Sequence, residues 1–395
     1  ALASEAIAGG ECEATLVVGG EARYRALRAS IAGEEAPETP DERTPDHTQV
    51  PEEEFYLPEE TGSGLGYMPV NYYAIMESAF RHARGWSVSE GRDRVAALYS
   101  RFSAVSEHNP HAWKPGYVPA GTIRDPGERN PMHAFPYTKL HNTSWNVDQA
   151  GALLLCSQQK ADELGIPETQ RVYPLASAQC EQMLSVALRR RLDRVPGVAA
   201  AGQRLEQSLG LRLADVDFIE LYSCFPVAVL AYASELGLSL ERDLTVTGGL
   251  PFAGGPLNNY VIQATCRLAE LLRASPGSTG LVSSVSGLMT KQGLGLWSAA
   301  PPALPFRSLD VTEEVSAANP PVSVLSRYEG LARVAGYTVV YERGQQQRAV
   351  AMLDTPAGER VVAWTEDPGL MRSMEQEEWV GRDVACRDGQ LAVTP

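Results

Sequence analysis

The residues with the clearest chemical potential lie in a glycine-rich segment before a predicted helix. Two glycine pairs, Gly248-Gly249 and Gly254-Gly255, are followed by Pro256, which suits the first turn of a helix. Apolar residues recur at three- and four-residue spacing over 257–272, which predicts a helix with one buried face. The N–H groups of such a loop and the positive end of the helix dipole can bind a phosphate or an oxyanion. A tight strand-to-helix connection without a ligand is the alternative.

Two further predicted loops follow strands that we expect to lie in one sheet with the glycine-rich segment at its edge. The apolar runs 216–221 and 280–285 predict buried strands, and 244–247 predicts a short strand before the glycines. The first strand leads through Tyr222 and Cys224 into a helix at 227–236, and the second ends at Ser286-Gly287. Because ligands of α/β sheets bind at the carboxyl ends of strands, we expect these residues and the glycine loop to share one site.

Strands and helices alternate over the first 300 residues. Ser87 and Glu90 form a capping box for a helix over 88–107, and Gly210 closes a helix that begins near Val195. The runs 146–157 and 171–178 predict further strands, the first of them buried and central. This alternation is typical of an α/β sheet with helices on both faces. After a proline-rich linker at 300–305, short alternating runs between 337 and 394 predict a small β-barrel or sandwich, with the charged stretch 366–378 as a helix or loop between them.

Two stretches are interpreted as connections. Between Glu34 and Glu60 there are eleven acidic residues, one basic residue and five prolines, which is typical of a mobile surface insertion. An acidic binding tail is the alternative interpretation. The stretch Thr61–Gly66 is glycine-rich but lacks the lysine and the Ser/Thr of a P-loop, so we interpret it as a linker.

Composition excludes several classes of function. The net charge of -15 argues against a nucleic-acid surface, and the compact basic run Arg189–Arg191 is interpreted as a solvated helix face. No apolar run is long enough to cross a bilayer. The six cysteines contain no CxxC pair, which predicts reduced thiols and a cytoplasmic location. His108 and His111 flank a proline and are interpreted as loop residues, so no metal site is predicted.

Three motifs, in order along the chain, resemble the thiolase superfamily. The stretch NVDQAGALLLCSQQKADELGI at 146–166 is similar to the Asn-Asp-Gly-Ala-Ala-Ala strand of thiolases. DVDFIELYSCFP at 215–226 is similar to the approach to their Glu-Leu-Asn-Glu-Ala-Phe strand end, and TGGLPFAGGP at 247–256 is similar to Asn-Gly-Gly-x-x-x-x-Gly-His-Pro. With its β-rich extension, the chain resembles the thiolase-like protein type 1 group, which is often labelled acetyl-CoA acetyltransferase.

This resemblance implies a thiolase fold of two related, layered α/β halves with the first half incomplete. We expect an N-terminal half at 1–178 with a loop insertion at about 33–145, a C-terminal half at 179–305, and an additional β-barrel-like domain at 313–395. The nucleophilic cysteine of the family would lie before Ala1, so the N-terminal part is expected to be missing. A homodimer is expected from the tendency of the family, with a partner protein as the alternative.

The resemblance also implies where the site residues lie. Gly255 takes the place of the histidine that activates the nucleophile, Ser286 that of the second cysteine, and Tyr222 that of an asparagine or histidine. We expect standard thiolysis and condensation to be impaired, because glycine has no side chain to accept a proton and serine is far less acidic than a thiol. Cys224 matches a cysteine of the sterol-carrier thiolases. Substrate contacts are predicted at Gly249, Phe252, Gly254, Gly255, Asn258 and Gly287.

Three functional hypotheses follow from the resemblance. The chain is an acyltransferase-family enzyme of lipid metabolism, a CoA-ester binding or scaffolding protein without thiolase turnover, or an aldolase-type lyase. In the lyase, Tyr222 donates a hydrogen bond to a substrate oxygen and the backbone amides of 254–259 form an oxyanion site. All three hypotheses involve a coenzyme A thioester as substrate or ligand and no tightly bound cofactor.

Overall fold

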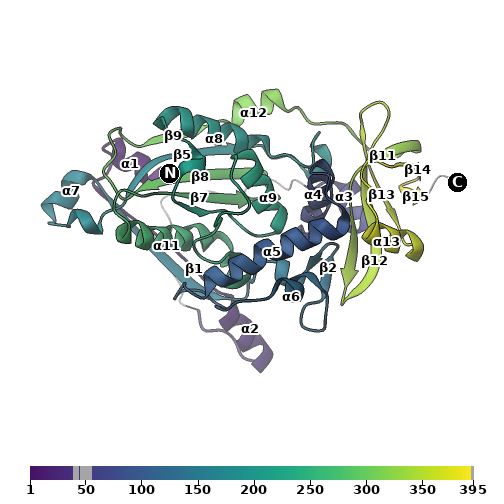
Figure 1. The fold of residues 1–395 in the computed structure, drawn as a ribbon, viewed down its shortest axis with the longest axis horizontal. Coiled ribbons are helices and arrows are strands. Elements are labelled where there is room, and N and C mark those ends of the chain that lie inside the picture. The colour runs from purple at the N-terminus through teal and green to yellow at the C-terminus, as the bar shows by residue number, and fades with distance from the viewer. Residues whose placement is uncertain (39–43, 45–55, 393–395) are drawn as a thin grey trace.

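The computed structural model describes residues 1–395 except 39–43, 45–55 and 393–395. Most of the acidic segment 34–60 therefore lies outside the described residues. The chain forms a five-stranded sheet with helices on both faces, a separate two-stranded sheet and a β-barrel (Figure 1). None of the described helices is both long enough and apolar enough to cross a membrane.

The five-stranded sheet confirms the strands predicted at 171–178, 216–221 and 280–285. In spatial order it contains β6 (Phe218–Glu220), β7 (Thr279–Ser286), β8 (Lys291–Ser298), β5 (Tyr173–Glu181) and β9 (Arg307–Asp310). β6 is parallel to β7, and β9 is parallel to β5, while β8 runs antiparallel to both of its neighbours. The carboxyl ends of β6 and β7 therefore meet at one edge, as the site prediction requires.

Helices cover the two faces of this sheet. On one face, Leu268 of α11 (Tyr260–Ala274) packs directly against Gly280 of β7. A Cβ at Gly280 would overlap the Leu268 side chain. On the opposite face, Gly197 of α8 (Pro196–Leu209) packs in the same way against Gln292 of β8. The predicted closure of α8 is confirmed, since Gly210 adopts φ 65°. Two shorter helices, α9 (Pro226–Glu235) and α12 (Thr312–Ala318), flank α8.

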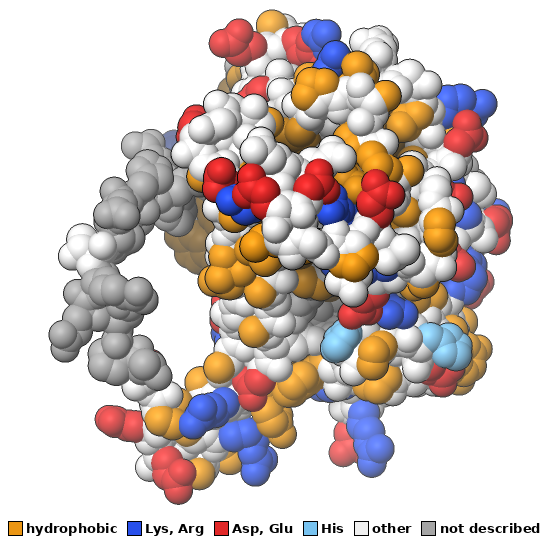
Figure 2. All heavy atoms as spheres, turned by 90° about the vertical axis from the view of Figure 1, so that its left-hand side faces the viewer, with side chains coloured by type: hydrophobic (Ala, Val, Ile, Leu, Met, Phe, Trp, Pro, Cys, Tyr) orange, Lys and Arg blue, Asp and Glu red, His pale blue; other side chains and the backbone are white. Residues whose placement is uncertain are grey.

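The two-stranded sheet lies on the other side of α11. Its strands, β1 (Ala14–Ala22) and β4 (Asp148–Cys156), pair antiparallel along their full length. Gly19 and Gly151 pack against Ile262 of α11, while Leu16, Val18 and Leu154 on the other face are 62%, 63% and 69% exposed. The prediction of a buried central strand at 146–157 is therefore wrong, because β4 has one strand neighbour among the described residues. Figure 2 views the molecule from this side, and exposed hydrophobic side chains are visible there. Three short helices flank this sheet, namely α1 (Leu2–Ala8), α2 (Arg23–Ala32) and α7 (Gln158–Glu163).

Residues 56–141 form a helical layer between the sheets and the barrel. The helix predicted at 88–107 is confirmed as α5 (Val88–Ser106), and Ser87 Oγ accepts from Glu90 N at 3.2 Å. The predicted linker 61–66 instead forms a π-helical turn, η1 (Thr61–Leu65), in which Ser63 and Leu65 are buried. Its glycines let the backbone pass close to Arg348 of the barrel. The other elements are α3 (Pro58–Glu60), α4 (Pro69–Ala83), α6 (Ala120–Arg124), β2 (Met132–Ala134) and β3 (Tyr137–Thr138).

The C-terminal region contains the predicted barrel. Its five strands close in the order β11-β12-β13-β15-β14 and back to β11, and a helix, α13 (Pro368–Gln376), follows the third strand. This strand order, with a helix between the third and fourth strands, is that of an OB-type Greek-key barrel. The strands are β11 (Glu329–Glu342), β12 (Gln345–Asp354), β13 (Arg360–Thr365), β14 (Asp383–Arg387) and β15 (Gln390–Ala392). β10 (Val324–Leu325) pairs with β13, and β2 pairs with β11.

A buried arginine joins the helical layer to the barrel. Arg81 of α4 is 2% exposed, and its guanidinium donates to Tyr337 Oη at 2.8 Å and to both carboxylate oxygens of Glu378. Gly91 of α5 leaves room for this side chain, since a Cβ there would overlap Arg81 Cδ. The barrel is therefore fixed to α4 by a charged contact that has little access to water.

A buried carboxylate fixes the loop that precedes the glycines. Glu220, at the end of β6, accepts from Val246 N at 2.8 Å, Thr247 N at 3.0 Å and Tyr260 Oη at 2.5 Å. The hydroxyls of Thr245 and Thr247 also donate to it. The strand predicted at 244–247 is wrong, because these polar groups bond to Glu220 instead of to a neighbouring strand. Burial raises the pKa of the Glu220 carboxyl, and the donors oppose this shift.

Replacing the buried arginine tests the link between α4 and the barrel. We expect Arg81→Met to lower the free energy of unfolding by about 3 kcal/mol, because it removes the guanidinium that donates to Glu378 and to the Tyr337 hydroxyl. Urea denaturation measures this change. Arg94→Met is the matched control, since its pair with Glu90 is exposed and is expected to contribute less than about 0.5 kcal/mol. Equal effects of the two substitutions would contradict the link.

Replacing Glu220 tests whether the carboxylate holds the loop. Glu220→Gln keeps the shape but directs an NH2 group at N–H and O–H donors, so we expect a loss of about 2 kcal/mol in the free energy of unfolding. Urea denaturation of Glu241→Gln provides the control, because Glu241 is 83% exposed. A Glu220→Gln protein as stable as the control would show that the loop does not depend on this charge.

Candidate functional site

The predicted site residues lie on loops that meet at the carboxyl ends of β6 and β7. Tyr222 N donates to Ser283 Oγ at 2.9 Å, which ties the loop after β6 to β7. The Tyr222 ring packs edge-on against Tyr260 at the start of α11, with the ring centroids 5.4 Å apart. Leu250 N donates to Ser223 Oγ at 3.0 Å and joins the glycine loop to the same place. Ser286 is exposed at the end of β7, next to Gly287.

Tyr222 presents a neutral hydroxyl. The side chain is half-buried, and among the described residues its hydroxyl has no hydrogen-bond partner. Burial raises the pKa of Tyr222, with a smaller contribution from nearby Cys224. The residue can therefore donate a hydrogen bond at neutral pH, but it cannot act as a base.

Cys224 is a buried thiol and not a reactive thiolate. It is 9% exposed, and burial raises its pKa to about 12. Its side chain forms a hydrogen bond with Tyr73, whose ring stacks on Phe225 with centroids 4.3 Å apart. A thiol must ionise to become a nucleophile, so this environment favours a packing role for Cys224 over covalent chemistry.

The position of Gly255 is closed by another side chain. A Cβ added at Gly255 would overlap the methyl group of Thr143, so this backbone position has no room for any side chain. The hydroxyl of Thr143 donates to the Cys224 carbonyl at 3.2 Å, which holds the methyl group in place. Gly254 adopts φ 102° and lies against Gln149, so the glycine pair also fixes the path of the backbone.

Most of the amides expected to form an oxyanion site already have acceptors. Gly255 N donates to Ser144 O at 2.9 Å, Leu257 N to Gly255 O at 2.8 Å, and Asn259 N to Pro256 O at 2.9 Å. Pro256 has no N–H group to offer. The other predicted contact residues lie nearby: Gly249 precedes α10 (Leu250–Ala253), which contains buried Phe252, and Asn258 is exposed in η6 (Leu257–Asn259).

Two polar residues that the sequence analysis did not select lie beside this loop. Asn259 is 4% exposed, and among the described residues neither atom of its side-chain amide has a hydrogen-bond partner. Gln149 donates to Ala253 O at 2.8 Å, while its Oε1 is buried without a described partner. The Asn258-Asn259 pair before α11 was the available signal, but spacing alone does not show which asparagine faces inward. Among the described residues no cluster of His, Cys, Asp or Glu could hold a metal ion.

Comparisons with known proteins agree with this architecture. No family model matches the chain. Over 143 residues it is 29% identical to the 3-ketoacyl-CoA thiolase of Vibrio vulnificus and 28% identical to that of Shewanella loihica, covering 36% of this chain and 35% of each relative. The alignments therefore span about a third of the length of the curated relatives.

Solved structures match over a larger part of the chain. The monomeric SCP2-thiolase like protein type 1 of Mycobacterium smegmatis aligns with a TM-score of 0.80 at 25% identity, covering 99% of this chain and 80% of that one. The Ltp2-ChsH2(DUF35) aldolase aligns with a TM-score of 0.53 at 18% identity, covering 75% of both chains, and shares the fold. The predicted resemblance is confirmed, and the chain belongs to the thiolase-like superfamily.

Proposed function

We propose that this chain binds a coenzyme A thioester, or a compound derived from one, at the edge formed by Tyr222, the glycine loop and Ser286-Gly287. Its relatives are named as thiolases of 3-ketoacyl-CoA, which supports an acyl-CoA ligand. We further propose that the chain does not catalyse standard thiolysis, and one observation supports this. The methyl group of Thr143 occupies the place where a side chain at Gly255 would begin.

Standard thiolysis is not part of the proposed function. That chemistry needs a base beside the nucleophile and an acid that delivers a proton to the acyl carbon. In this chain the first position is a glycine packed against Thr143, and the second is the exposed Ser286. The chain therefore keeps the loops of a thiolase-like site without the side chains for that reaction.

An aldolase-type lyase is the second candidate. It is favoured by the hydroxyl of Tyr222, which has no hydrogen-bond partner among the described residues. In a retro-aldol step, the β-hydroxyl of the substrate loses its proton and becomes the carbonyl of one product as the Cα–Cβ bond breaks. The electron pair forms a thioester enolate, which then takes up a proton at Cα. A neutral tyrosine can stabilise the enolate oxygen by donating a hydrogen bond. The aldolase among the structural matches shares this fold.

Replacing Gly255 by histidine tests whether the packing of Thr143 excludes a side chain at this position. We expect acetoacetyl-CoA thiolysis to stay at background in both the unaltered protein and Gly255→His, and we expect the substitution to lower the melting temperature because it displaces Thr143. Gly127→His is the matched control, since a Cβ at Gly127 meets nothing within 4 Å. Isothermal titration with acetyl-CoA should still detect binding to the unaltered protein. Thiolysis gained by Gly255→His, or no binding of acetyl-CoA, would contradict the proposal.

Tyr222→Phe separates the lyase from a protein that only binds CoA esters. Cleavage of a β-hydroxyacyl-CoA should fall at least about 100-fold if this hydroxyl stabilises the enolate, because removing one such donor typically costs that much. Stability should change little, since the hydroxyl has no partner among the described residues. Tyr232→Phe is the control for packing, because its buried hydroxyl donates to Ser284 O at 3.0 Å and its loss should lower stability. No cleavage by the unaltered protein, or undiminished cleavage by Tyr222→Phe, would exclude the lyase.

A further inference from the structure

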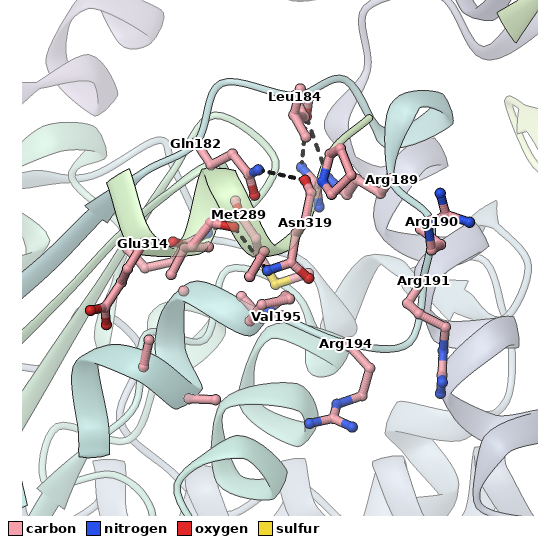
Figure 3. Close-up of a pocket in the computed structure, with 18 of the residues that line it drawn as sticks. Gln182, Leu184, Arg189, Arg190, Arg191, Arg194, Val195, Met289, Glu314 and Asn319 are labelled. Atoms are coloured by element: carbon pink, nitrogen blue, oxygen red, sulfur yellow. Dashed lines mark hydrogen bonds between the residues drawn. The ribbon is translucent and has the colours of Figure 1, made fainter. Parts of the chain in front are cut away.

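A cavity of about 580 Å³ opens between the loop 182–195, the start of α8, the β7–β8 turn and α12 (Figure 3). Its apolar wall includes Leu184, Val195, Met289 and Val315. Four arginines lie around it, and the one acidic residue in its lining is Glu314, which pairs with Arg204. The run Arg189–Arg191 does not form a solvated helix face as predicted. It belongs to an irregular segment between a short 3₁₀ helix, Val186–Leu188, and α8.

The four arginines differ in how their charges are compensated. Arg191 pairs with Asp193 and Arg194 with Glu235, each through two hydrogen bonds. Neither Arg189 nor Arg190 has an ion pair among the described residues. Two positive charges at this cavity therefore have no carboxylate partner in the part of the chain that the structure describes.

Among the described residues, the acceptors that hold Arg189 in place are all neutral. Its guanidinium donates to Leu288 O at 2.6 Å and to Leu184 O at 3.2 Å, and Figure 3 shows the contact with Leu184. The carboxylate of Glu60 raises the pKa of Arg189 from a distance. The two oxygens of this carboxylate accept hydrogen bonds from Ala187 N and Leu57 N. Burial lowers the pKa of Arg189 to about 10, as expected for a cation removed from water without a close anion.

Two further features adjoin the cavity. The first turn of α8, a helix of 14 residues, begins at Pro196 and Gly197 in the lining of the cavity, so the positive dipole end of the helix lies beside it. Gln292 is 7% exposed, and its Nε2 donates to Met289 O. That bond fixes the amide so that Oε1, which has no partner among the described residues, packs against Gly197 at the start of α8.

We propose that this cavity binds a small amphipathic organic anion, with its phosphate or carboxylate at Arg189, Arg190 and the start of α8. The apolar part of the ligand lies against Leu184, Val195 and Met289. This site does not depend on the proposed acyl-CoA function, because none of the residues in that proposal lines the cavity.

Titration calorimetry with hexyl phosphate, hexanoate and 1-hexanol tests the site. We expect saturable binding of at least one of the two anions with a dissociation constant of about 1 mM or lower, and weaker binding of the alcohol. The tighter of the two anions identifies the charged group that the site prefers. No saturable binding of either anion, or hexanol binding as tightly as both, would overturn the proposal.

Two substitutions locate the binding within the cavity. Arg190→Gln should weaken anion binding about tenfold, because it removes a charge-assisted contact, and it should fold normally since Arg190 is exposed. Ala199→Phe should abolish binding by filling the space beside α8. Arg212→Gln is the matched control, because it removes the same charge from an exposed position outside the lining and should bind like the unaltered protein. Unchanged binding in both cavity variants would overturn the assignment.

Discussion

The carboxylate of Glu220 is the constraint on which the candidate site depends. It ends β6 without access to water and satisfies five donors from the loop 245–247 and from Tyr260. A buried carboxylate is costly unless donors surround it, so the loop must follow the path that supplies them. Tyr260 begins α11, and α11 packs between the two sheets. One charged group thus sets the glycine loop, the helix start and the ring against which Tyr222 packs.

Much of the fold follows from local patterns in the sequence. The buried face of α11, the Ser87 cap of α5 and the glycine that closes α8 depend on residues a few positions apart, so the sequence reveals them. The secondary-structure predictions were wrong where contacts with residues far away in the chain determine the structure. Residues 244–247 have a strand-like composition, but their threonines donate to Glu220, and the glycines of 61–66 allow close packing against Arg348. β4 has the apolar pattern of a central strand, yet one of its faces is exposed.

The same distinction applies to the candidate site. The order of motifs indicated which loops meet at the edge of the sheet, because parallel strands bring their carboxyl ends together. The sequence could not show that Thr143, more than 100 residues before Gly255, fills the space beside it. It also could not show that Asn259 faces inward while Asn258 faces solvent, or that Arg189 has no carboxylate partner within the described ranges. Each of these features depends on contacts between segments that are far apart in the chain.

These contacts show that several segments pack together around Gly255 and close the space beside it. Thr143 fills the position beside Gly255 and also bonds to the backbone of Cys224, so its movement would disturb the loop that carries Tyr222. The amide of Gly255 is bonded to Ser144, the next residue along the chain, which fixes the glycine loop from the same side. A histidine at Gly255 would therefore require the segment 143–144 and both loops to shift together. The packing around Gly255 therefore leaves no room for a base at this position unless these segments rearrange.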